Sequence, residues 1–77
     1  MLYVGWVTIP TNEETGARIA KLRKDKQLTQ HELAAKANLH VATVQRAESG
    51  KPSKLETFKD IAEVLGVGLG ELLEAGR

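Results

Sequence analysis

Hydrophobic residues along most of the chain recur at the three-and-four spacing of amphipathic helices. The clearest example is the run of Leu55, Phe58, Ile61, Ala62 and Leu65. Five stretches carry this pattern or form short apolar runs between polar breaks, and they span about residues 13–26, 30–37, 41–49, 54–65 and 69–75. We therefore expect five short helices joined by connections of a few residues, which is an all-α domain.

The first ten residues, MLYVGWVTIP, follow a different pattern, because strand-forming side chains dominate and Pro10 ends the run. We expect residues 1–12 to be a short extended N-terminal segment and residues 13–77 to be the helical domain. An exposed apolar strand favours aggregation, so we expect it to be covered. Three arrangements stay open: pairing with the same strand of a second subunit, packing on its own domain beside Ala47, and disorder.

Local signals predict where several helices begin and end. Residues 29–32 read Thr-Gln-His-Glu, a capping box in which the hydroxyl and the carboxylate each accept a hydrogen bond from the other residue's backbone. Residues 53–56 read Ser-Lys-Leu-Glu and predict a second capping box at the fourth helix. We expect left-handed backbone at Asn38, since Asn tolerates it best after Gly. His40 falls at the N-cap position of the third helix.

Composition argues against several classes of protein. The 77 residues include no cysteine, so neither a disulfide nor a thiolate metal site is available. His31 and His40 have no cluster of carboxylates near them in the sequence, and no nucleophilic set or Gly-rich phosphate loop is present. We expect no enzyme activity, no metal and no cofactor. No apolar run is long enough to span a membrane, so we expect no membrane partner.

The net charge of the chain is only +1, but the charge is unevenly distributed. Residues 15–57 hold nine basic and four acidic side chains, whereas each flank has a net charge of −2. Positive charge therefore gathers in the block that contains the second and third predicted helices. On charge alone, a solvated surface of mixed sign is the simpler interpretation.

A motif changes this interpretation. Residues 29–51, TQHELAAKANLHVATVQRAESGK, resemble the helix-turn-helix of the phage repressor and Cro type, often called the XRE family. The positions in register with the family pattern are Thr29, Gln30, Leu33, Ala34, Asn38-Leu39-His40, Val44 and Glu48-Ser49-Gly50. The flanking helices are also similar, so the resemblance covers about residues 15–74. It implies a five-helix, repressor-like DNA-binding domain.

Three positions depart from the family pattern. Asn38 replaces a glycine, which is a mild change because Asn also adopts left-handed backbone. Ala47 replaces a large apolar side chain, which leaves a space that another group must fill. Val41 and Ala42 replace polar residues at the start of the third helix, so the bases that this helix would read stay open.

The resemblance implies that the third helix, about residues 41–49, lies in the DNA major groove, which admits one α-helix. The residues expected to contact bases are Val41, Ala42, Gln45 and Arg46. Arg46 would pair with guanine and Gln45 with adenine, while the two apolar residues would meet thymine methyl groups. The residues expected to contact phosphates are Thr29, Gln30, His40, Thr43, Lys51 and Lys54. Arg23 and Glu48 are expected to form a structural ion pair between the first and third helices.

The function that follows is sequence-specific binding of double-stranded DNA by a transcriptional regulator, expected to be a repressor in the cytoplasm and encoded by a bacterium or a phage. We expect a homodimer on a near-palindromic operator, formed through the N-terminal strand or through the fourth and fifth helices, where Leu69, Leu72 and Leu73 lie. The alternative is a protein-interaction module, or an antitoxin-type partner protein, that keeps the fold with weak or no DNA binding. The low net charge and the apolar Val41-Ala42 pair favour this alternative slightly.

Overall fold

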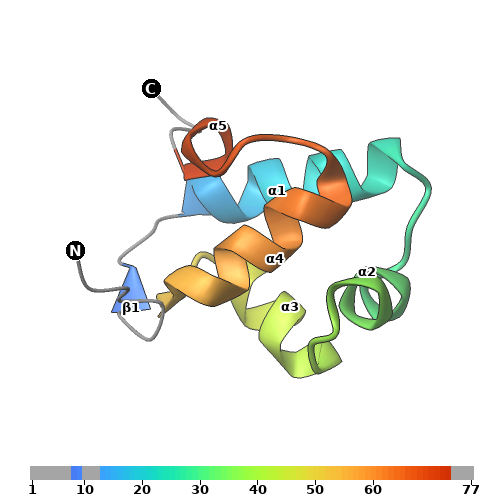
Figure 1. Cartoon of the computed structure of the whole chain (residues 1–77), viewed down its shortest axis with the longest axis horizontal. Helices are drawn as coiled ribbons and strands as arrows, with labels where there is room; N and C mark the ends of the chain where they lie inside the picture. The colour runs from blue at the N-terminus through green and yellow to red at the C-terminus, as the bar shows by residue number, and fades with distance from the viewer. Residues whose placement is uncertain (1–7, 10–12, 74–77) are drawn as a thin grey trace.

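The computed structural model describes residues 8–9 and 13–73 of the chain. Within these ranges it contains five helices and two strands of two residues each (Figure 1). The helices are α1 (Glu13–Asp25), α2 (Gln30–Ala37), α3 (Val41–Glu48), α4 (Leu55–Leu65) and α5 (Leu69–Leu73), and the strands are β1 (Thr8–Ile9) and β2 (Ser53–Lys54). The predicted five-helix fold is confirmed, and the short strand pair is an addition to it.

All five helices meet in one core. α4 lies in the middle of the bundle; it packs on α2 and α5, while α1 packs on α3 and α5 (Figure 1). Each helix contributes at least one fully buried side chain, and the largest of these are Ile19, Leu33, Val44, Phe58, Ile61 and Leu72. Helices of 5 to 13 residues are marginal in isolation, so this shared core is what stabilises them.

The burial of Leu72 corrects one sequence-based expectation. Leu72 was expected on a dimer surface, but its side chain has no exposed area because it packs in the core of its own domain. Leu69 and Leu73 pack against the same core and are only partly buried. Any dimer surface formed by α4 and α5 would therefore use Leu69 and Leu73 without Leu72.

The predicted local signals are correct around α2. The Thr29 hydroxyl accepts a hydrogen bond from the Glu32 N–H at 3.0 Å, and the Glu32 carboxylate accepts one from the Thr29 N–H at 2.8 Å. The bond from the Thr29 backbone lowers the pKa of Glu32 below its ordinary value. Asn38 adopts left-handed backbone with φ 59° and ψ 45°, as expected for the end of this helix.

The second predicted capping box, at residues 53–56, is wrong. α4 begins one residue later than that prediction requires, at Leu55, and its N-cap is Lys54, whose side chain makes no capping hydrogen bond. The Ser53 hydroxyl donates instead to the carbonyl of Lys51 at 3.4 Å. The physical reason is that Ser53 and Lys54 pair as β2 with β1, which keeps both residues in extended backbone.

The strand pair is antiparallel, with Thr8 opposite Lys54 and Ile9 opposite Ser53. In Figure 1, β1 lies beside the start of α4. The two described residues of the N-terminal segment therefore pair with their own domain. Residues 1–7 and 10–12 lie outside the described ranges, so pairing of the segment with a second subunit stays a prediction.

A close approach of two helices accounts for the glycine at position 16. A Cβ atom added to Gly16 of α1 would overlap the carbonyl oxygen of Glu48 and lie 2.8 Å from the backbone nitrogen of Gly50. The backbone of α1 therefore contacts the end of α3 directly. Ala47, which precedes this contact, is fully buried without a large side chain.

We expect Gly16→Ala to destabilise the domain by about 1–3 kcal/mol, because the new methyl group meets backbone that can move only by separating α1 from α3. For a domain of this size, each kcal/mol lowers Tm by roughly 4–8 °C. The matched control is Gly70→Ala in α5, where the added Cβ would have no atom within 4 Å. Thermal melts of both variants test this contact. A Gly16→Ala variant with the same Tm as the wild type would contradict it.

Candidate nucleic-acid interface

A buried ion pair connects α1 to the end of α3. The Arg23 guanidinium donates from Nε to Glu48 Oε2 at 2.6 Å and from its second terminal nitrogen to Glu48 Oε1 at 3.1 Å. A further donor of Arg23 reaches the carbonyl of Leu28 at 2.8 Å. The two side chains are only 11% and 8% exposed. Hydrogen bonding to Glu48 raises the pKa of Arg23, so its charge is retained.

The same carboxylate also holds Gln30, the first residue of α2. The Gln30 side-chain amide donates from Nε2 to Glu48 Oε1 at 3.0 Å. Sequence reasoning paired Glu48 with Arg23 but missed this third member, since no local pattern links residues 18 positions apart. The contact ties the residue expected to bind a phosphate to the end of the helix expected to read bases.

α3 has a buried side and an exposed side. Val44 and Ala47 are fully buried, whereas Ala42, Gln45 and Arg46 are exposed. Val41 is partly buried and packs against the core, so only part of its surface is open to a partner. Three of the four residues expected to contact bases therefore lie fully on the outer side, and Val41 lies at its edge.

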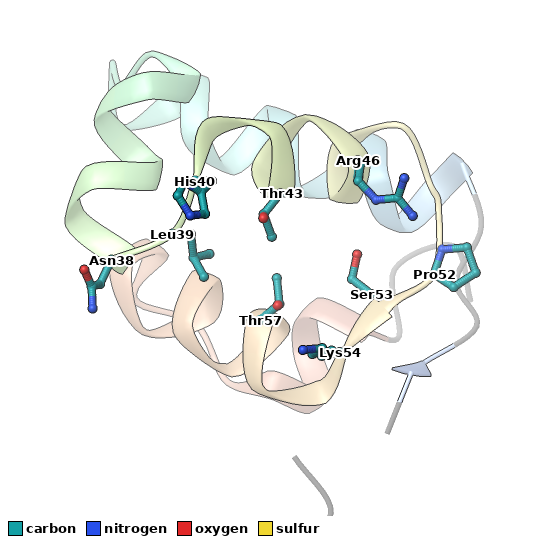
Figure 2. Close-up of a pocket in the computed structure, with 9 residues that line it drawn as sticks. All are labelled: Asn38, Leu39, His40, Thr43, Arg46, Pro52, Ser53, Lys54 and Thr57. Atoms are coloured by element: carbon teal, nitrogen blue, oxygen red, sulfur yellow. The ribbon is translucent and has the colours of Figure 1, made fainter. Parts of the chain in front are cut away.

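A groove of about 430 Å³ runs along one flank of α3 (Figure 2). His40, Thr43 and Arg46 line it from the α3 side, and β2 with the start of α4 forms the opposite wall. The residues on that wall are Pro52, Ser53, Lys54 and Thr57. Figure 2 shows Arg46 and Lys54 extending from opposite walls, which places two cationic groups beside the same hollow.

The structure divides the expected phosphate-contacting residues into two groups. Thr29 and Gln30 lie at the start of α2, whereas His40, Thr43 and Lys54 line the groove on the other flank. Lys51 is exposed in the connection between α3 and α4. The first group is tied to the end of α3 by the bond from Gln30 to Glu48. Arg46, which is expected from the sequence to contact a base, lines the groove with the second group.

Two further kinds of feature, a cluster of metal-binding side chains and a membrane-spanning helix, are not found in the described ranges. Residues 8–9 and 13–73 contain no group of three or more His, Cys, Asp or Glu side chains that could hold a metal ion. Across the same ranges, no helix is long and apolar enough to cross a lipid bilayer.

Comparison with known proteins matches this arrangement to helix-turn-helix domains. A family model described as helix-turn-helix matches residues 19–72. The chain is similar to the N-terminal DNA-binding domain of SinR from Bacillus subtilis, with 28% identity and a TM-score of 0.76 over 86% of this chain and 99% of that chain. No curated protein matches the chain.

Two further solved structures are similar to this chain, and each contains a bound partner molecule. One is the biofilm master regulator SinR in complex with DNA, with 27% identity and a TM-score of 0.73 over 78% of this chain and 98% of that chain. The other is the complex of SinR with SinI, with 27% identity and a TM-score of 0.73 over 78% of this chain. The chain spans 60% of the length of the SinR chain in that complex.

We expect Glu48→Ala to destabilise the domain by about 3–5 kcal/mol, because it leaves the buried Arg23 guanidinium without its carboxylate. Lys21→Ala is the matched control, since it removes an exposed ion pair with Asp25 whose side chains are 72% and 57% exposed. That pair should contribute only about 0.3–0.5 kcal/mol. Urea unfolding of both variants measures the difference, and equal midpoints would show that the buried pair has no structural role.

Proposed function

The chain belongs to the helix-turn-helix family of the phage repressor and Cro (XRE) type, and from this membership we propose that it represses transcription by binding operator DNA through α3. Family and fold are those of DNA-binding regulators rather than enzymes. The observation that carries the proposal is the exposed side of α3, which has a groove holding Thr43 and Lys54 along its flank and the start of α2 tied to its end through Gln30 and Glu48. The similarity to SinR in its complex with DNA supports the same mode of binding.

The two groups would bind the phosphates on either side of the major groove. At the start of α2, Thr29 and Gln30 lie at the positive end of the helix dipole, which favours an anion. On the other flank, Thr43 and Lys54 would meet the second strand, with His40 and Lys51 beside them. Phosphate contacts fix the position of a protein on DNA but carry no sequence information directly.

Base recognition would come from the outer side of α3, through Ala42, Gln45 and the open part of Val41. Gln45 offers the paired donor and acceptor that adenine requires, whereas the apolar residues fit thymine methyl groups. Arg46 lines the groove with Thr43 and Lys54, which supports a phosphate contact in place of the base contact expected from the sequence.

We propose that a dimer binds the operator, since two recognition helices about 34 Å apart can read both halves of a near-palindromic site. Residues 1–12 or the surface carrying Leu69 and Leu73 would form its interface. The second candidate function is protein interaction without DNA binding. It is supported by the similarity to SinR in its complex with SinI, and by the apolar start of α3.

DNA selected from a random pool by the wild-type chain should contain a recurring, near-palindromic sequence. Its affinity should fall with salt, because each phosphate neutralised contributes about −0.9 to the slope of log K against log salt. If Arg46 and Lys54 each neutralise one phosphate, the slope should be about −2 or steeper for each domain. If the selected DNA contains no recurring sequence and its affinity for the chain does not change with salt, the protein-interaction module is favoured.

Two neighbouring variants separate phosphate contact from base reading. Arg46→Ala should weaken binding to all sequences alike and make the salt slope shallower by about 0.9. Gln45→Ala should keep the slope and relax the preference at one base pair in each half-site, by about 1–3 kcal/mol. Repeating the selection with both variants decides the assignment, and relaxed preference at a single base pair for Arg46→Ala would restore Arg46 as a base contact.

A further inference from the structure

β1 lies outside residues 19–72, the part of the chain that matches the family model, yet it pairs with an element of the candidate interface. Its partner, β2, is the second half of the connection between α3 and α4. Ser53 and Lys54 of β2 also line the groove beside α3. β1 therefore lies beside the strand that forms part of one wall of that groove.

The two halves of this connection are held in different ways. The first half bonds back to α3: the N–H of Gly50 donates to the carbonyl of Ala47 and the N–H of Lys51 to that of Arg46, both at 3.1 Å. The second half begins at Pro52, which has no N–H to donate. Ser53 and Lys54 then pair with β1, while the Lys54 side chain makes no capping hydrogen bond to α4.

We propose that β1 is a positioning strand for DNA binding, which fixes Ser53 and Lys54 in the groove wall before DNA arrives. This inference rests on the proposed function, since the groove binds phosphates only if the chain binds DNA as proposed. The fixed backbone of β2 matters most for Lys54, because the ammonium group of Lys54 lies across the groove from Arg46 (Figure 2). The N-terminal segment then acts on DNA binding through β2, without contacting DNA itself.

The size of the effect follows from backbone freedom. Fixing the backbone of a single residue corresponds to roughly a tenfold change in an equilibrium constant. A connection that β1 no longer holds must be ordered when DNA binds, so affinity should fall by about tenfold for each residue released. The number of phosphates contacted stays the same, so the salt slope should not change.

The geometry of an antiparallel pair supplies an internal control. Successive residues of such a strand alternate between hydrogen-bonded and non-hydrogen-bonded pairs, so only one of Thr8→Pro and Ile9→Pro removes a ladder hydrogen bond. Amide hydrogen exchange on the wild-type chain identifies which one. Protection of the Lys54 amide indicates that Thr8→Pro is the disruptive variant, and protection of the Ser53 amide indicates Ile9→Pro.

The test measures the affinity of the 77-residue chain for the duplex that the wild type enriches from the random pool, and for sheared genomic DNA. The disruptive proline variant should lose protection in β2 and bind about tenfold more weakly if it releases one residue of β2, or about a hundredfold if it releases both, with the wild-type Tm and salt slope. The other proline variant should have the affinity of the wild type for DNA. The same affinity is expected for the valine variants Thr8→Val and Ile9→Val. Lys54→Ala should instead make the salt slope shallower by about 0.9.

Three results would overturn the proposal: no protection at either β2 amide, equal affinity for both proline variants, or a lower salt slope in the disruptive one. Failure of the proposed function looks different. In that case the wild-type chain binds neither DNA probe, while the exchange experiment still reports whether β1 holds β2.

Discussion

Glu48 accepts hydrogen bonds from two other helices at once, through Arg23 of α1 and Gln30 of α2. It is also the last residue of α3, so its carboxylate sets where that helix ends relative to both neighbours. Replacing a buried ion pair by apolar residues of similar shape is often neutral for stability. The particular effect of this pair is therefore geometric, because the planar guanidinium and the carboxylate meet in one orientation.

This arrangement holds α3 at several points in spite of its length of eight residues. Its inner side is held by Val44 and Ala47, its end by Glu48, and the approach of α1 at Gly16 leaves no room for α3 to shift inward. Rigidity matters for reading DNA, since base contacts require donors and acceptors held in place by their neighbours. Gly16 is consistent with this requirement, because the absence of a Cβ lets the backbone of α1 contact the backbone at the end of α3 directly.

Local features could be predicted from the sequence, and features that depend on distant residues could not. The bounds of α2 and the conformation of Asn38 were predicted correctly, because capping and left-handed backbone involve residues within one turn. The capping box at residues 53–56 was predicted wrongly, because its sequence signal is overridden by pairing with residues more than 40 positions earlier. The bond from Gln30 to Glu48, and the groove that gathers Arg46 with Lys54, likewise depend on the packing of several helices.

The start of α3 has a structural role that its sequence does not reveal, beside the recognition role proposed for it. Val41 packs partly on the core, while Ala42 next to it is exposed and too small to reach far. Polar contacts to DNA would then shift from the start of α3 toward Gln45 and to the side chains that flank the helix. Affinity in such an interface depends more on how well the flanking phosphate contacts are positioned, since these contribute most of the salt-dependent binding energy. A strand that pairs with β2 at Lys54 fits an interface in which the recognition helix offers few polar groups of its own.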